Sequence, residues 1–279
     1  MNSNLIKRSI SGLLFVILLV GSIVYGSVTF VALFALFSAF TTYELTGLLN
    51  DTQKVTVNRP ITALGSFYLF IAMAGYVSDN ATSVIFIPYL AIMLYLFIQQ
   101  LYLKHENPIG NLSATMLSQF YVGLNFALIN ALSFVSNEGG LYVDYYYIMP
   151  LALFIFIWVN DTGAYCVGSL LGKRKLFPRI SPNKSWEGSI GGGISTLIAA
   201  AIIASISPIL SYAEWMGFGL VVAVFGTWGD LIESRFKRQL KIKDSGNILP
   251  GHGGFLDRFD STLIAIPAVV FYIYLIKMF

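Results

Sequence analysis

The sequence is short of charged residues and of cysteine, and each shortage excludes a class of protein. Only 11% of its 279 residues are charged, whereas soluble domains carry about 25%. Because 56% of the residues are hydrophobic, one water-soluble core of this length could not bury them. The single cysteine, Cys166, excludes an intramolecular disulfide and a cysteine-rich zinc site. Long loops and low-complexity tails are also lacking, so we expect an all-α, polytopic integral membrane protein with one membrane domain over residues 1–279.

Nine apolar stretches reach or nearly reach the roughly 20 residues that a membrane-spanning helix needs. The first follows Lys7 and Arg8, as a signal peptide would. Its apolar run is long, however, and the next one begins after a Gly26-Ser27 break without a clear cleavage site, so we interpret it as an uncleaved span. The predicted spans are residues 9–26, 27–49, 60–77, 82–103, 112–136, 146–171, 189–207, 212–233 and 258–278.

Basic residues are distributed very unevenly between the two sides of such a nine-span chain. Sixteen of the 17 lysines and arginines fall on the side of the N-terminus, and only Lys277 falls on the other. Positive loops stay in the cytoplasm, so we expect a cytoplasmic N-terminus, in the inner membrane if the protein is bacterial. Eleven of the sixteen lie within residues 173–184 and 235–258. Topology alone would need two or three per loop, and the excess favours a surface that attracts an anion.

Several acidic residues lie inside or at the ends of the predicted spans, where an ionisable group is costly and is a functional candidate. Glu44 is near one end of its span and could either snorkel to the interface or serve a function. Asp161 lies deeper. Two further pairs, Asp230/Glu233 and Asp257/Asp260, are each three residues apart, so each pair shares a helix face. Ion pairing with nearby basic residues is the structural alternative for the acids other than Glu44.

Asp230 ends one predicted span and Asp257 begins the next on the same side of the membrane. A hairpin connection could bring Asp230, Asp257 and Asp260 together, and a cation between them would relieve their repulsion. Hard oxygen ligands suit Mg²⁺, which proteins bind through one or two carboxylates together with phosphate oxygens. The sequence therefore predicts a magnesium site with these three aspartates as ligands.

Two glycine-rich segments lie next to these acids. In "GHGG", residues 251–254, the glycines would let backbone N–H groups approach a phosphate just before a helix, although such a run is also typical of a plain turn. "SPNKSWEGSIGGG", residues 181–193, offers hydroxyl, ammonium and carboxylate groups before the seventh span. A helix cap followed by close packing of small residues is its structural alternative, and we assign Gly191, Gly192 and Gly193 mainly to packing.

The stretch "SRFKRQLKIKDSGNILPGHGGFLDRFD", residues 234–260, resembles the signature of the phosphatidate cytidylyltransferases, or CDP-diacylglycerol synthases. The upstream stretch "NDTGAYCVGSLLGKRKLFPRISPNKSWEG" is also similar to this family, with Ser185 where threonine is frequent. The resemblance covers about residues 158–262. We accordingly divide the chain into N-terminal helices of unclear role, residues 1–140, and catalytic helices and cytoplasmic loops, residues 146–279. The matching positions are Ser234, Lys237, Arg238, Lys243, Asp244, Gly246, Pro250, His252, Gly253, Gly254, Asp257, Arg258 and Asp260.

The resemblance implies a reaction in which CTP and phosphatidate give CDP-diacylglycerol and pyrophosphate. It implies magnesium as cofactor, with potassium as a second cation, and an active site at the cytoplasmic side. CTP, phosphatidate and the membrane are the expected partners, with no nucleic acid and with room for a homodimer. Catalytic roles are expected for Asp230, Asp257, Asp260, Lys243 and His252. Substrate contacts are expected from Asp161, Ser181, Lys184, Ser185, Glu187, Ser234, Lys237, Arg238, Asp244, Gly253, Gly254 and Arg258.

The attacking group would be a phosphate that is largely dianionic at neutral pH. It needs no general base, so we expect His252 to contact phosphate or to organise its loop. Three other functions are weighed against this one. An ion-coupled transporter would show an internal repeat, and the sequence has none that we detect. Enzymes that consume CDP-alcohols resemble one another in aspartates four apart, and Asp257 and Asp260 are three apart. A CTP-dependent lipid kinase is chemically nearest.

Overall fold

The computed structural model describes residues 3–104, 107–136, 142–246 and 253–278, and side chains from Ile10 onward. The chain divides into two compact units, which are described separately. The first contains residues 1–147 and 240–258, and the second contains residues 148–239 and 259–279. The prediction of one membrane domain stays a prediction.

The all-α membrane class predicted from composition is confirmed. In the part of the chain that the structure describes, eight helices are long and apolar enough to cross a membrane, and a shorter apolar stretch, Ile10–Tyr25, belongs to a further helix. The strands among the described residues form two-stranded antiparallel sheets, with three to five residues per strand. Backbone groups within a bilayer must be satisfied locally, which is why helices account for the spans.

The first unit begins with α1 (Ser3–Tyr25) and α2 (Ser27–Gln53), which Gly26 separates with a φ of 154°. This positive φ favours glycine and confirms the expected break between the two helices. The unit continues with α3 (Arg59–Val77), η1 (Ser83–Phe86), α4 (Ile87–Ile98), η2 (Gln99–Leu101), α5 (Pro108–Ser118), the π-helix η3 (Gln119–Leu124), α6 (Asn125–Leu128), α7 (Asn130–Ser133), β1 (Phe134–Ser136) and β2 (Val143–Tyr145).

Polar side chains lie in the interior of this unit. Gln119, at the start of the π-helix, donates from Nε2 to the carbonyl of Thr62 at 2.7 Å and to Ser66 Oγ at 3.1 Å. Thr42 Oγ1 in turn donates to Ser66 Oγ at 2.8 Å. These contacts join α2, α3 and η3 by hydrogen bonds between buried side chains.

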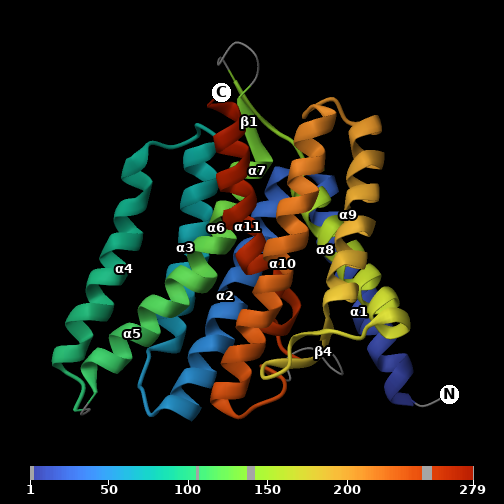
Figure 1. The fold of residues 1–279 in the computed structure, drawn as a ribbon. Coiled ribbons are helices and arrows are strands. Elements are labelled where there is room, and N and C mark those ends of the chain that lie inside the picture. Colours follow the sequence, from blue (N-terminus) through green and yellow to red (C-terminus); the bar gives the residue numbers. More distant parts are fainter. Residues whose placement is uncertain (1–2, 105–106, 137–141, 247–252, 279) are drawn as a thin grey trace. The chain divides into compact units, whose positions relative to one another are not determined.

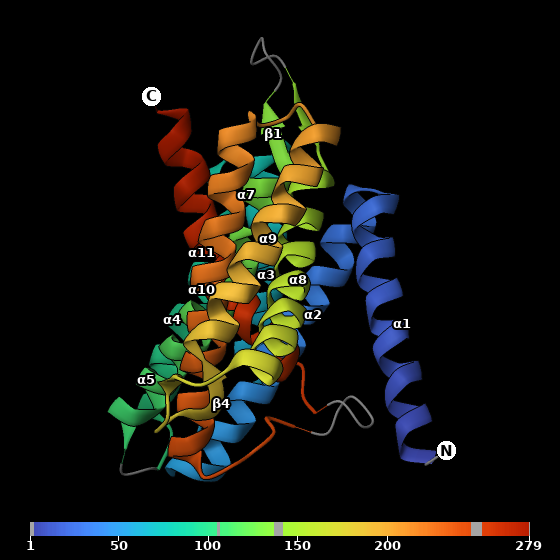
Figure 2. The ribbon, with the colours of Figure 1, turned by 45° about the vertical axis from the view of Figure 1, so that its right-hand side comes forward.

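The second unit consists of α8 (Ile148–Leu171), β3 (Lys175–Phe177), β4 (Ser181–Ser185), α9 (Trp186–Ile206), most of α10 (Tyr212–Leu240) and most of α11 (Leu256–Lys277). Figures 1 and 2 show α8, α9 and α10 as adjacent helices, with the β3–β4 hairpin at one end of them.

Glycines allow α8 and α9 to approach closely. A Cβ on Gly192 would lie 2.6 Å from the carbonyl oxygen of Asn160, and one on Gly191 would lie 2.5 Å from Val167. The packing role expected for Gly191 and Gly192 is confirmed. For Gly193 that role is wrong, because a Cβ there would meet nothing within 4 Å.

The C-terminal end of α10 differs from the sequence prediction. The structure extends α10 to Leu240, beyond the expected end at 233, so that Arg235, Lys237 and Arg238 lie on its last turns rather than in a loop. Basic side chains at a helix C-terminus are favoured by the helix dipole. Lys237 Nζ also lies 2.5 Å from Glu233 Oε2, one turn earlier, and such pairs support helical structure.

Candidate active site

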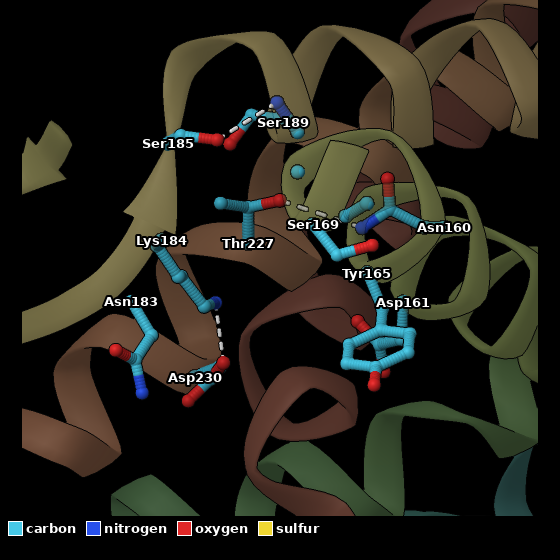
Figure 3. Close-up of a pocket in the computed structure, with 13 residues that line it drawn as sticks. Asn160, Asp161, Tyr165, Ser169, Asn183, Lys184, Ser185, Ser189, Thr227 and Asp230 are labelled. Carbon is cyan, nitrogen blue, oxygen red and sulfur yellow. Dashed lines mark hydrogen bonds and ion pairs between the residues drawn. The ribbon is translucent and has the colours of Figure 1, made fainter. Parts of the chain in front are cut away.

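A pocket of about 440 Å³ lies in the second unit, among α8, β4, the start of α9 and α10. Figure 3 shows its polar side chains, and the side chains of Lys184 and Asp230 point toward each other in it. α10 continues for about ten residues, or roughly 15 Å, beyond Asp230, whereas α8 ends at Leu171, just after Ser169. The lining residues are Asn160, Asp161, Ala164, Tyr165, Gly168, Ser169, Asn183, Lys184, Ser185, Gly188, Ser189, Thr227 and Asp230.

An ion pair joins β4 to α10 in this pocket. Lys184 Nζ contacts Asp230 Oδ2, and the two side chains are 26% and 29% exposed. Ser234 Oγ, one turn along α10, donates to Asp230 Oδ1 at 3.1 Å. Both oxygens of Asp230 therefore have a partner, and Lys184 places a positive charge in the pocket.

Two further acids belong to this neighbourhood. Asp161 lines the pocket from α8. Asp260, on the first turns of α11, is partly buried and accepts a hydrogen bond at Oδ1 from the N–H of Ser261. The charges of Asp161, Asp230 and Asp260 are near enough to act on one another. Asp161, Asp230 and Asp260 therefore lie near one another in the second unit. The predicted grouping of Asp230 and Asp260 with Asp257 stays a prediction, since Asp257 belongs to the first unit.

The fit of these acids to a magnesium ion follows from their chemistry. Within residues 3–104, 107–136, 142–246 and 253–278, no three His, Cys, Asp or Glu side chains form a complete metal cage. Mg²⁺ is usually held by one or two carboxylates plus substrate phosphates and water, not by an all-protein cage. Asp230 and Asp260 supply such a pair of hard oxygen donors, so the residues fit the ion.

The sequence analysis did not select Asn160 and Thr227, which also line the pocket. Asn160 Nδ2 donates to Thr227 Oγ1 at 3.4 Å, while Asn160 Oδ1 is buried with no hydrogen-bond partner among the described residues. A buried acceptor of this kind costs free energy unless a ligand or water satisfies it. The signal that could have identified Asn160 is the polar pair Asn160-Asp161 within an apolar span.

Two of the expected substrate-binding residues have structural partners. Ser185 Oγ accepts from the N–H of Gly188 at 3.1 Å and caps α9, as Ser residues commonly do. Glu187 accepts from the backbone N–H groups of Lys173 and Arg174 at 3.1–3.2 Å, and so anchors the hairpin segment to α9. These contacts realise the helix cap that the sequence left open as an alternative.

The remaining predicted residues are distributed over both units. Ser181 begins β4, and Arg238 Nε donates to the carbonyl of Ile180 at 3.5 Å. Exposed residues Lys243, Asp244 and Arg258 lie in the first unit, as do Gly253 and Gly254. His252 lies outside the described residues.

Glu44 does not snorkel to the membrane surface. It is only 5% exposed, and its carboxylate accepts hydrogen bonds from residues that follow α10, all within the first unit. Of the two alternatives for Glu44, snorkelling to the interface is therefore wrong.

Known proteins match nearly the whole length of this chain. Residues 6–276 match the model of the cytidylyltransferase family. A phosphatidate cytidylyltransferase of Bacillus subtilis is 33% identical over 269 residues, which cover 95% of this chain and 96% of that protein. Those of Staphylococcus aureus (strain COL) and Staphylococcus saprophyticus are 42% and 43% identical over 153 and 154 residues, about half the length of each protein. Since the family match includes the N-terminal helices as well as the pocket, the chain belongs to the cytidylyltransferase family.

Proposed function

We propose that this protein is a phosphatidate cytidylyltransferase, which converts CTP and phosphatidate to CDP-diacylglycerol and pyrophosphate in phospholipid biosynthesis. The observation that carries the proposal is a polar pocket between apolar helices, with Lys184, Asp230 and Asp161 around it, in a chain of this family. A membrane enzyme that joins a water-soluble nucleotide to a lipid headgroup needs a polar site within reach of the bilayer.

Asp230 and Asp260 are the carboxylates that would hold a magnesium ion. Asp257 is proposed as a third ligand of that ion, and potassium as a second cation. The ion would supply neutralisation of the CTP phosphates and orientation for in-line attack. Lys184 lies where it can pair with a phosphate oxygen once the anion arrives. The phosphatidate phosphate is its own nucleophile, so the pocket needs no residue to remove a proton. A homodimer stays a prediction.

Basic side chains on α10, in the loop after it and at the start of α11 would attract both polyanionic substrates. Arg235 lies in a second pocket of the second unit, of about 380 Å³ and otherwise apolar. A groove of apolar side chains beside one arginine suits a lipid with an anionic headgroup, which supports the lipid half of the proposal. Its lining consists of Phe177, Ile180, Trp228, Leu231, Ile232, Arg235 and Phe236.

Labelled CTP tests the function. Purified protein in mixed micelles with phosphatidate and Mg²⁺ is given CTP labelled at the α-phosphate, or in a parallel reaction at the γ-phosphate. We expect the α-label in CDP-diacylglycerol and the γ-label in pyrophosphate. Transfer of the γ-label to the lipid would instead identify a lipid kinase and refute the proposal.

We also propose that the N-terminus and the basic loops are cytoplasmic, because of the sixteen-to-one bias of basic residues. Tags inserted at residues 55 and 178 should be reached only by cytoplasmic reporters, and tags at 80 and 211 only by reporters on the opposite side. Only fusion proteins that retain enzymatic activity are used to assign the side of each loop. A single active fusion on the wrong side would contradict the nine-span topology.

A further inference from the structure

Glu44, on α2, binds backbone groups at the start of α11. Its carboxylate accepts from the N–H of Phe255 at 2.9 Å, from the N–H of Leu256 at 3.1 Å and from Ser245 Oγ. The first N–H groups of a helix have no partner within the helix, and the helix dipole favours negative charge there. Glu44 therefore satisfies the N-terminus of α11 from another helix.

Asp257 makes the complementary contacts from α11 itself. Its Oδ2 accepts from the N–H groups of Ser245 and Gly254, both at 2.9 Å. The N–H of Asp257 donates to Ser245 Oγ at 3.3 Å, and that hydroxyl is the one that donates to Glu44. Glu44, Ser245 and Asp257 thus form one network, which we call the α2–α11 clamp, and all of it lies in the first unit.

The clamp explains the glycines around it. A Cβ on Gly246 would lie 2.8 Å from Glu44 Oε2, and one on Gly254 would overlap both Glu44 Oε1 and Ser245 Oγ. Gly253 has a φ of 78°, a conformation that side chains rarely adopt, and its Cβ would lie 2.5 Å from Asp257 Oδ2. The N–H of Gly254, which the sequence suggested for phosphate binding, is directed to Asp257.

We infer that Glu44 is a positioning residue for cytidylyl transfer, which holds the first turn of α11 and through it the carboxylate of Asp257. The inference rests on the proposed function and gives the N-terminal helices a role in it. Two hydrogen bonds to Asp257 Oδ2 set the direction of that carboxylate, and Glu44 fixes the segment that donates one of them. Partners that orient a metal-ligating carboxylate typically contribute about 10–100-fold to metal affinity or activity.

Glu44→Gln is the first test variant, because it keeps the size of the side chain and places an amide where a carboxylate accepts. Ser245→Ala is the milder second variant, since it removes only the hydroxyl shared by Glu44 and Asp257. Thr41→Val is the matched control: Thr41 is buried on the same helix, and its hydroxyl has no hydrogen-bond partner among the described residues.

Two measurements are made on purified, folded protein. Hydrogen exchange reports the backbone N–H groups of residues 253–258, and steady-state kinetics give kcat, the KM for CTP and the half-saturating Mg²⁺ concentration. For Glu44→Gln we expect faster exchange confined to that segment, a kcat about 10–100-fold lower per folded molecule and a higher Mg²⁺ requirement. Ser245→Ala should change the exchange rate, kcat and Mg²⁺ requirement in the same direction but less. A variant with both substitutions should differ little from Glu44→Gln alone, because the two residues belong to one network. Thr41→Val should match the wild type.

A kcat and Mg²⁺ requirement equal to wild type, with faster exchange, would show that the clamp is only structural and would overturn the inference. Unchanged exchange would overturn it as well. If Glu44→Gln does not fold, the same two outcomes are decisive for Ser245→Ala. Wild-type protein that fails to make CDP-diacylglycerol would refute the proposed function itself, whereas the exchange result would still report on the clamp.

Discussion

Asp230→Asn should lower the rate of CDP-diacylglycerol formation about a thousandfold, or about 4 kcal/mol in activation free energy. Asparagine keeps the size of the side chain but removes the charge that faces Lys184 and that would hold the metal ion. Asp260→Asn should behave alike, because its carboxylate lies in the same group of interacting charges. Rates are measured over a range of Mg²⁺ concentrations, and excess Mg²⁺ should restore part of the activity.

Asp51→Asn is the control for this prediction, since Asp51 is exposed near the end of α2 and should tolerate the change. The competing explanation is that Asp230 serves only as a partner for Lys184. In that case Asp230→Asn would lower the melting temperature and leave turnover that does not respond to Mg²⁺. Full wild-type activity in EDTA would refute the metal proposal outright.

Gly254→Ala should be among the most destabilising single-methyl additions in the chain. The added Cβ would overlap the oxygens of Glu44 and Ser245, so the start of α11 must move and their hydrogen bonds must break. Overpacking costs about 1–3 kcal/mol, and each lost hydrogen bond adds about 1 kcal/mol. We expect a loss of about 3 kcal/mol in unfolding free energy, seen as a lower melting temperature in detergent, and a low activity in the fraction that folds.

Gly193→Ala provides the matched control, because a Cβ there meets nothing within 4 Å and the residue lies inside α9. Alanine is favoured over glycine in a helix interior by about 1 kcal/mol, so this variant should melt at or above the wild-type temperature. A Gly254→Ala protein that melts with the wild type would contradict the close packing of Glu44 against Gly254.

The helices could be predicted from the sequence because a bilayer leaves an apolar segment few alternatives. Their ends were harder to predict. The charged residues after 233 indicate a loop by hydropathy, but Glu233 and Lys237 pair along the helix and α10 continues to Leu240. Pairing of charged residues one turn apart is a weaker signal in the sequence than hydropathy. The end of α10 nevertheless agrees with the pairing and not with the hydropathy.

The candidate site was partly predictable for a different reason. Asp161 and Asp230 were singled out because charges within spans are costly, and Lys184 because it lies in a basic, glycine-rich segment between two spans. That Lys184 on β4 pairs with Asp230 on α10 depends on a hairpin whose direction no periodicity reports. The role of Glu44 was the least predictable feature, since its partners lie more than 200 residues away along the chain and outside the N-terminal half.

The separation between Glu44 and its partners has a consequence for biosynthesis. Glu44 leaves the ribosome 211 residues before Phe255, the residue whose N–H it accepts. At synthesis rates of about 5–20 residues per second, α2 waits about 10–40 s for the segment that satisfies its carboxylate. During that time a nascent membrane helix carries an acid without its final partners, which makes it a target for membrane quality control. Chains that stop before residue 256 should therefore be degraded faster than truncated chains that carry Glu44→Gln.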